Sequence, residues 1–319
     1  MKNTSKLEHF PISFFSVIMG LAGFTLVVQK GLAMLGLHTA ISQYILYIVV
    51  ILFVIITALY IIKMIYFFQA VQDELNNPVR LSFFPTFTIS ILLLSICFLD
   101  VNMIISRYLW IVGAILHLIA TIVILSMWVR QSKFEINHFN PAWFIPIVGN
   151  ILVPIAGIQH FSPEISWFYY SIGIVFWILL FTIFLYRIIF HHPLSKRLMP
   201  TFFILIAPPS LGFISYVKLT GEIDSFARIL YYFALFLFIF LVAQIRMFYG
   251  TTFYLSWWAY SFPIAALTVA TSLFLSQTGI AFFKPLFFGF ASLLTLFIIV
   301  LIVNTVIAIY RGNICVKEE

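Results

Sequence analysis

Ten long apolar stretches constrain the fold of this chain more than any other feature of its sequence. A helix needs about 20 mostly apolar residues to cross the roughly 30 Å hydrocarbon core of a bilayer. Only 8% of the 319 residues are charged, whereas soluble domains carry about 25%. The chain is therefore predicted to be an all-α integral membrane protein with ten transmembrane helices. The predicted spans are Pro11–Gln29, Ile41–Phe68, Pro85–Leu99, Ser106–Val129, Phe144–Ile158, Ile165–Ile189, Thr201–Val217, Ile223–Phe248, Ser256–Ser276 and Phe282–Tyr310.

The spans alternate between two kinds. Even-numbered spans are long and rich in Ile, Leu and Phe, whereas odd-numbered spans hold most of the prolines, glycines and small residues. Irregular backbone at membrane depth is tolerated where protein or a water-filled cavity surrounds it. The pattern predicts five parallel helical hairpins, with the five broken helices inside and quasi-fivefold symmetry around a central pore. Some odd spans look short, and their true ends are expected to extend into the flanking loops.

The distribution of basic residues predicts the orientation. Of the 17 Lys and Arg residues, 12 lie on the side that holds both termini and 5 on the other. The positive-inside rule places both termini in the cytoplasm. The chain is expected to form one channel domain over residues 1–319 in the cell (inner) membrane, with short tails at 1–9 and 312–319. The start of the chain has no signal-peptide pattern, so the first span is expected in the mature protein.

One aromatic residue in the ninth span has unusual neighbours. At 3.6 residues per turn, the face that holds Phe262 otherwise carries small side chains and one valine: Ala259, Ala265, Ala266, Val269 and Ser272. Pro263 follows directly and is expected to interrupt the helical hydrogen bonds. Such a ring either fills a core or closes a hole.

The odd spans, as bounded above, contain no Asp, Glu, Lys, Arg or His. They are either plain buried helices or the walls of a conduit without fixed charge. Backbone N–H groups at the breaks and hydroxyl groups could then favour anions; the candidate donors are Ser16, Thr88, Ser210, Ser261 and Thr268. The alternative for each hydroxyl is a helix–helix contact. Asn150 is expected to make an interhelical hydrogen bond, and Asp224 to cap the eighth span.

Several function classes find no support in the residues. The two cysteines lack metal-ligand spacing, and no phosphate-binding loop, nucleophile elbow or paired catalytic carboxylate is present. No metal, cofactor or nucleic-acid partner is predicted, and the chain is not expected to be an enzyme.

Six stretches, in order along the chain, carry a resemblance to a known family: "FPISFFSVIMGLAGF", "NPVRLSFFP", "VGN", "FFILIAPPS", "GEIDSFARILYYFALFLFIFLVAQI" and "WWAYSFP". The chain resembles the tellurite-resistance/dicarboxylate transporter family, which includes bacterial TehA and the plant slow-type guard-cell anion channels. The resemblance implies a homotrimer in which each subunit has its own pore. It also implies that the phenylalanine of "SFP", here Phe262, closes that pore, with Pro263 as a hinge. The long cytosolic extensions of the plant channels have no counterpart here, so kinase regulation is not carried over.

The leading hypothesis is a gated anion channel for small monovalent anions such as chloride and nitrate. Its predicted pore lining is Ser16, Gly20, Phe84, Thr88, Asn150, Ser210, Ser261 and Ala266. The alternative is a secondary transporter or exporter of C4-dicarboxylate, sulfite or tellurite-like oxyanions.

Overall fold

The structure is a computed structural model that describes residues 6–250 and 252–316. All secondary structure in these two ranges is helical, and ten segments are long and apolar enough to cross a membrane. The predicted tails, and with them Lys2 and Lys317, lie partly outside the described residues.

Five of the ten segments, which we call the inner spans, share one construction. Each begins as a 3₁₀-helix and continues as an α-helix. The pairs are η1 (Ile12–Phe14) with α1 (Phe15–Met34), η2 (Arg80–Phe83) with α4 (Thr86–Phe98), η4 (Pro141–Phe144) with α6 (Ile145–His160), η5 (Lys196–Ile206) with α8 (Ala207–Thr220), and η7 (Leu255–Tyr260) with α10 (Ser261–Thr278).

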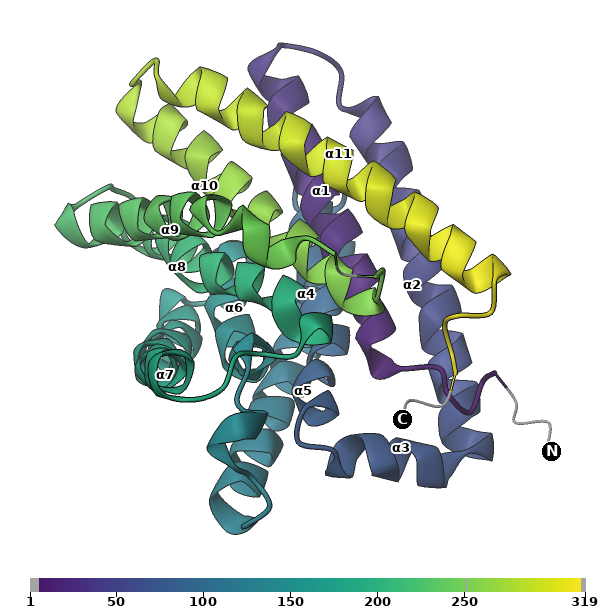
Figure 1. The fold of residues 1–319 in the computed structure, drawn as a ribbon. Helices are drawn as coiled ribbons and strands as arrows, with labels where there is room; N and C mark the ends of the chain where they lie inside the picture. The colour runs from purple at the N-terminus through teal and green to yellow at the C-terminus, as the bar shows by residue number, and fades with distance from the viewer. Residues whose placement is uncertain (1–5, 251, 317–319) are drawn as a thin grey trace.

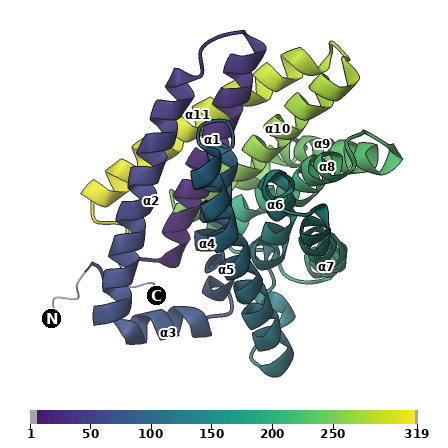
Figure 2. The same cartoon turned by 180° about the vertical axis from the view of Figure 1, so that it is seen from behind.

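The other five segments, the outer spans, are single α-helices: α2 (Ala40–Tyr66), α5 (Met103–Arg130), α7 (Pro163–Phe190), α9 (Ser225–Ala243) and α11 (Phe283–Tyr310). Short helices α3 (Phe68–Asn76), η3 (Ile136–His138) and η6 (Ile245–Phe248) lie in connections. In Figure 2, α3 runs across the end of α2. The sequence did not predict α3.

Burial separates the two kinds of span as the composition predicts. The buried share of the apolar window is 72–94% in the inner spans and 22–33% in the outer spans. Each inner α-helix contacts the next one along the chain, and α10 contacts α1, so the five close a ring. Each outer span contacts the inner span before it, as α11 does with α10 in Figure 1.

Prolines mark where the α-helical part begins in four of the five inner spans. Pro85 is the N-cap of α4, Pro146 and Pro208 are second residues of α6 and α8, and Pro263 is the third residue of α10. The backbone N–H groups in the first turn of a helix have no intrahelical acceptor, so a proline there costs little. The expectation that Pro263 interrupts a helix in mid-run was wrong, because it lies where 3₁₀ geometry changes to α geometry.

The far ends of the spans also follow from local chemistry. Gly221 and Gly279, both with positive φ, end α8 and α10. Asp224 accepts a 2.9 Å hydrogen bond from the Ala227 N–H, which confirms its predicted role as the N-cap of α9. Every inner span extends past its predicted bounds at one end or at both, as expected. The third span already begins at Arg80, and the fifth continues to His160.

Candidate pore and its constriction

A cavity of about 500 Å³ lies inside the ring of inner spans. Every inner span contributes a stripe of residues, most of them three or four apart, which is one face of each helix. The stripes are Ile12, Ser16 and Met19; Phe83, Thr86 and Ile89; Ile145, Val148, Gly149 and Leu152; Ile204, Ala207 and Leu211; and Leu255, Trp258, Ala259, Phe262 and Pro263. The cavity walls are therefore mainly apolar.

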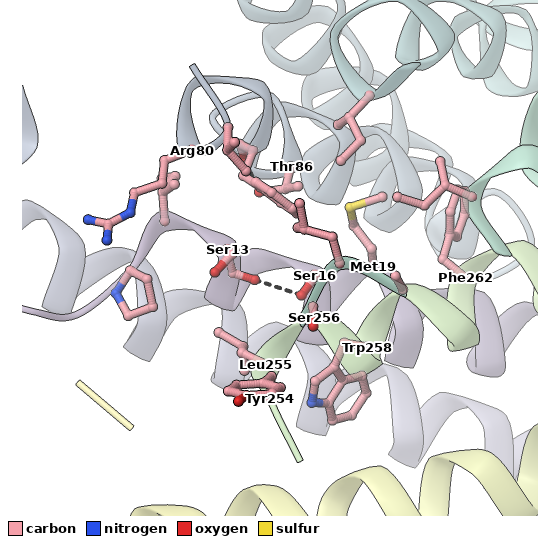
Figure 3. A pocket seen from close by; sticks show the side chains of 18 of the residues that line it. Ser13, Ser16, Met19, Arg80, Thr86, Tyr254, Leu255, Ser256, Trp258 and Phe262 are labelled. Atoms are coloured by element: carbon pink, nitrogen blue, oxygen red, sulfur yellow. Dashed lines mark hydrogen bonds between the residues drawn. The ribbon is translucent and has the colours of Figure 1, made fainter. Parts of the chain in front are cut away.

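Phe262 lies at one end of the labelled lining residues and Arg80 at the other, with Ser13, Ser16, Met19 and Thr86 between them (Figure 3). The Phe262 side chain is 8% exposed, on the first turn of α10. Among the described residues it has no aromatic neighbour, in contrast to Phe274 on the same helix, which packs against Phe213, Tyr231, Tyr232 and Phe283. The ring at 262 thus stands outside the aromatic packing that surrounds α10.

Two glycines of α1 fix the distance between α1 and α10 next to this ring. A Cβ at Gly20 would lie 2.9 Å from the Trp258 ring and would overlap the Ser261 hydroxyl. A Cβ at Gly23 would lie 2.8 Å from the Ala265 Cβ and 3.5 Å from the Phe262 ring. Because neither position tolerates a larger side chain without movement, α1 holds the backbone that carries Phe262 in place.

The hydroxyl groups that we expected to face anions donate to the backbone instead. Each of the five donates to a carbonyl one turn earlier in its own span. These bonds are Ser16 to Ser13 (2.6 Å, dashed in Figure 3), Thr88 to Pro85 (2.9 Å), Ser210 to Ile206 (2.8 Å), Ser261 to Trp258 (2.6 Å) and Thr268 to Ile264 (2.7 Å). This is the usual local bond of a Ser or Thr in a helix, so their hydrogens are already used.

The predicted site residues divide into two groups. Phe262, Pro263 and Ser16 line the cavity. Gly20, Phe84, Thr88, Asn150, Ser210, Ser261 and Ala266 lie outside its lining. For Phe84, Thr88, Asn150 and Ser210, the residue that lines the cavity is a neighbour in the sequence: Phe83, Ile89, Gly149 and Leu211. Asn150 donates 3.0 Å hydrogen bonds to the Thr121 hydroxyl of α5 and to the Ile147 carbonyl, which confirms its predicted interhelical bond.

Charged residues line the cavity at the end where Arg80 lies, opposite Phe262, and the sequence analysis missed them because it began the odd spans after them. Arg80 and Arg197 belong to η2 and η5 and line the cavity together with His9 and Glu74. The two guanidinium groups lie close enough to repel each other. Two cations on one wall give this end of the cavity a local preference for anions.

The carboxylate of Glu74 is held in a buried cluster. It lies 3.1 Å from the Lys63 ammonium and accepts a 2.8 Å hydrogen bond from the Tyr60 hydroxyl. Lys63 also donates to the Phe10 carbonyl at 2.8 Å. The two charged side chains are only 1% and 4% exposed. This cluster ties α2 and α3 to the segment that leads into η1.

In the described ranges, no group of three or more His, Cys, Asp or Glu residues is close enough together to hold a metal ion. Cys97 is buried in α4 and Cys315 is half-buried near the end of the chain, and both are free.

Comparisons with known proteins match nearly the whole chain. Residues 9–306 match the family described as SLAC1, voltage-dependent anion channel. The S-type anion channel SLAH3 of Arabidopsis thaliana is 28% identical over 309 residues, which cover 94% of this chain and 48% of the relative. The uncharacterized transporter MJ0762 of Methanocaldococcus jannaschii is 28% identical over 335 residues, covering 97% and 98%. A tellurite resistance protein TehA homolog of Haemophilus influenzae is 22% identical over 275 residues, covering 85% and 83%. The chain spans about half the length of the plant channels SLAH3, SLAH2 and SLAC1.

Proposed function

The chain belongs to the SLAC1 family of voltage-dependent anion channels, and from this premise we propose that it is a gated anion channel closed by Phe262. The proposal rests mainly on one observation: a cavity with stripes from all five inner spans has Phe262 in its lining, at the opposite end from Arg80. The permeating species are small monovalent anions, with chloride and nitrate as the candidates. The chain has a transport role and no catalytic one.

The gate works by excluding water. A narrow apolar constriction empties of water, and an ion that enters it must shed its hydration shell without compensation. The Phe262 ring closes the cavity, and Gly23, which has no side chain, lets α1 lie against it. Pro263 stiffens the adjacent backbone and acts as the hinge. Arg80 and Arg197 attract anions to the end of the cavity opposite Phe262.

The architecture that we propose is five parallel hairpins with quasi-fivefold symmetry around the cavity. The closed ring of inner spans and the contact of each outer span with the inner span before it support this arrangement. Ala266, one turn after Phe262 on α10, would belong to the conduit beyond the ring. The whole chain, residues 1–319, would act as one channel domain.

The assembly that we propose is a homotrimer with one pore per subunit, in the cell (inner) membrane and with both termini in the cytoplasm. The outer spans expose many large apolar side chains, as lipid or a neighbouring subunit would require. The excess of basic residues on the side of the termini supports the orientation.

One observation favours the second candidate, a transporter of dicarboxylate, sulfite or tellurite-like oxyanions. The cavity of about 500 Å³ is far larger than a halide, and two arginines line it. A divalent anion could bind between two such cations.

Proteoliposomes separate the two candidates. Vesicles loaded with potassium chloride and carrying Phe262→Ala protein are treated with valinomycin, without a proton gradient, and chloride efflux is followed with an electrode. A channel releases chloride at once. Efflux that requires a proton gradient or an exchanging dicarboxylate would instead support the transporter.

A further inference from the structure

A histidine in the middle of α5 lies directly behind the cavity wall. His117 is fully buried, and its ring contacts α4 and α6. A Cβ at Gly149 would overlap the Cε1 and Nε2 atoms of the imidazole and would lie 2.9 Å from Ile89. Gly149 and Ile89 both line the cavity. The histidine ring therefore occupies the space of a missing side chain in the pore wall.

Only one of its two ring nitrogens has a hydrogen-bond partner. The Nδ1 atom lies 2.7 Å from the Thr88 hydroxyl, which also lies 2.9 Å from the Pro85 carbonyl. The Nε2 atom, on the edge toward Gly149, has no partner among the described residues, and neither has the Oδ1 atom of Asn150. A buried polar atom without a partner is unfavourable. Because the ring is fully buried and lies outside the cavity lining, it would act on the cavity through its charge rather than by direct contact with an anion.

No charged side chain faces this ring in the described part of the chain. His117 is ten residues from Arg107, or about 15 Å along the helix. The ionisable residues on the helices packed around it are Cys97 on α4, His160 on α6, Arg107, Tyr108 and Arg130 on α5 itself, and Glu164, Tyr169, Tyr170, Tyr186 and Arg187 on α7. Tyr169 donates to the Ala114 carbonyl, and the charged residues lie near the helix ends. A proton on His117 would thus be the nearest charge to the cavity at this depth.

We propose that His117 is a specificity-determining residue of the pore, whose protonation increases the occupancy of the adjacent cavity by anions. The inference rests on the proposed anion-channel function. An imidazolium behind Gly149 adds a positive charge beside apolar walls, where it is poorly screened. Charge of one sign in such a cleft raises the local concentration of the opposite ion by about tenfold or more.

The test is a pH series of anion currents in planar bilayers, on the Phe262→Ala background so that the gate does not mask the effect. Between about pH 7 and about pH 4, a range low enough to protonate a fully buried imidazole, the anion current is expected to rise about tenfold. His117→Gln should remove this rise. His160→Gln, which replaces a histidine bound to the Ser106 hydroxyl at 2.9 Å outside the cavity lining, should keep it.

Two further variants keep the test decisive. His9 and Glu74 also line the cavity and could change charge in the same pH range. If His9→Gln removes the rise in current and His117→Gln does not, the inference is wrong. Thr88→Val removes the partner of Nδ1 and should move the midpoint of the response to lower pH. An unchanged midpoint in Thr88→Val would contradict the inference even where His117→Gln fails to fold. A protein without anion current at any pH would refute the proposed channel function instead.

Discussion

Replacing Phe262 by alanine should raise the anion conductance sharply at little cost in stability. The Phe262 ring lines a cavity and lacks aromatic neighbours among the described residues, so its removal breaks no aromatic packing. A fully packed Phe→Ala change costs about 3–5 kcal/mol. For Phe262, with one side toward empty space, we expect about 1–2 kcal/mol.

The gain in conductance follows from the barrier that the ring imposes. Each 1.4 kcal/mol removed from a barrier gives about a tenfold higher rate. Loss of an apolar plug that keeps water out should remove at least this much, so the conductance should rise about tenfold or more. Phe262→Leu, which is smaller but still apolar, should fall between the wild type and Phe262→Ala.

Phe274 provides the matched control, because it lies on the same helix and is fully buried against four aromatic rings. Phe274→Ala should lose about 3–5 kcal/mol and gain no current. The assay pairs the melting temperature of each purified protein with whole-cell current at a large driving force. A Phe262→Ala protein that is as unstable as Phe274→Ala and still silent would mean that the ring fills a core and that the gate lies elsewhere.

Three further predictions concern other parts of the molecule. Nitrate and iodide should permeate better than chloride, and fluoride worst, because the apolar walls compensate lost hydration only partly; reversal potentials that rank chloride above nitrate would contradict this. Glu74→Gln leaves the Lys63 charge buried and should cost about 3–5 kcal/mol in the free energy of unfolding. Adding Lys63→Met should recover part of that loss, whereas additive losses in melting temperature would refute a coupled pair. Burial raises the pKa of the Cys315 thiol to about 11, so its reactive thiolate is scarce at pH 7 and increases as the pH rises toward 11. In a Cys97→Ala background, maleimide should label Cys315 about two orders of magnitude more slowly at pH 7 than an exposed cysteine, and equal rates would contradict the burial.

Several features of the fold could be predicted from the sequence because they depend on composition. The family resemblance is confirmed over residues 9–306. The ten spans and the alternation of buried and exposed helices follow from hydropathy and from where prolines and glycines gather. Asp224 and Asn150 could be interpreted from local chemistry alone, since a polar group at a helix start or inside a span must find a partner.

The exact cavity lining could not be predicted, and the 3₁₀ segments give the physical reason. Phe84 and Ser210 were assigned to the pore without a helical register, and each inner span begins with 3.0 rather than 3.6 residues per turn. The residues that line the cavity are their neighbours Phe83 and Leu211. Arg80 and Arg197 were missed for a related reason, because a hydropathy window ends a span at the first charge.

Ion selectivity of the open pore tests the central claim most directly. A planar bilayer that contains Phe262→Ala protein separates potassium chloride solutions that differ tenfold in concentration, at equal pH on both sides. For a passive anion channel the current should reverse close to the chloride equilibrium potential, about 59 mV from zero, and a pH gradient should not move this potential. Reversal at the potassium potential, or a reversal potential that follows an imposed proton gradient, would contradict the account.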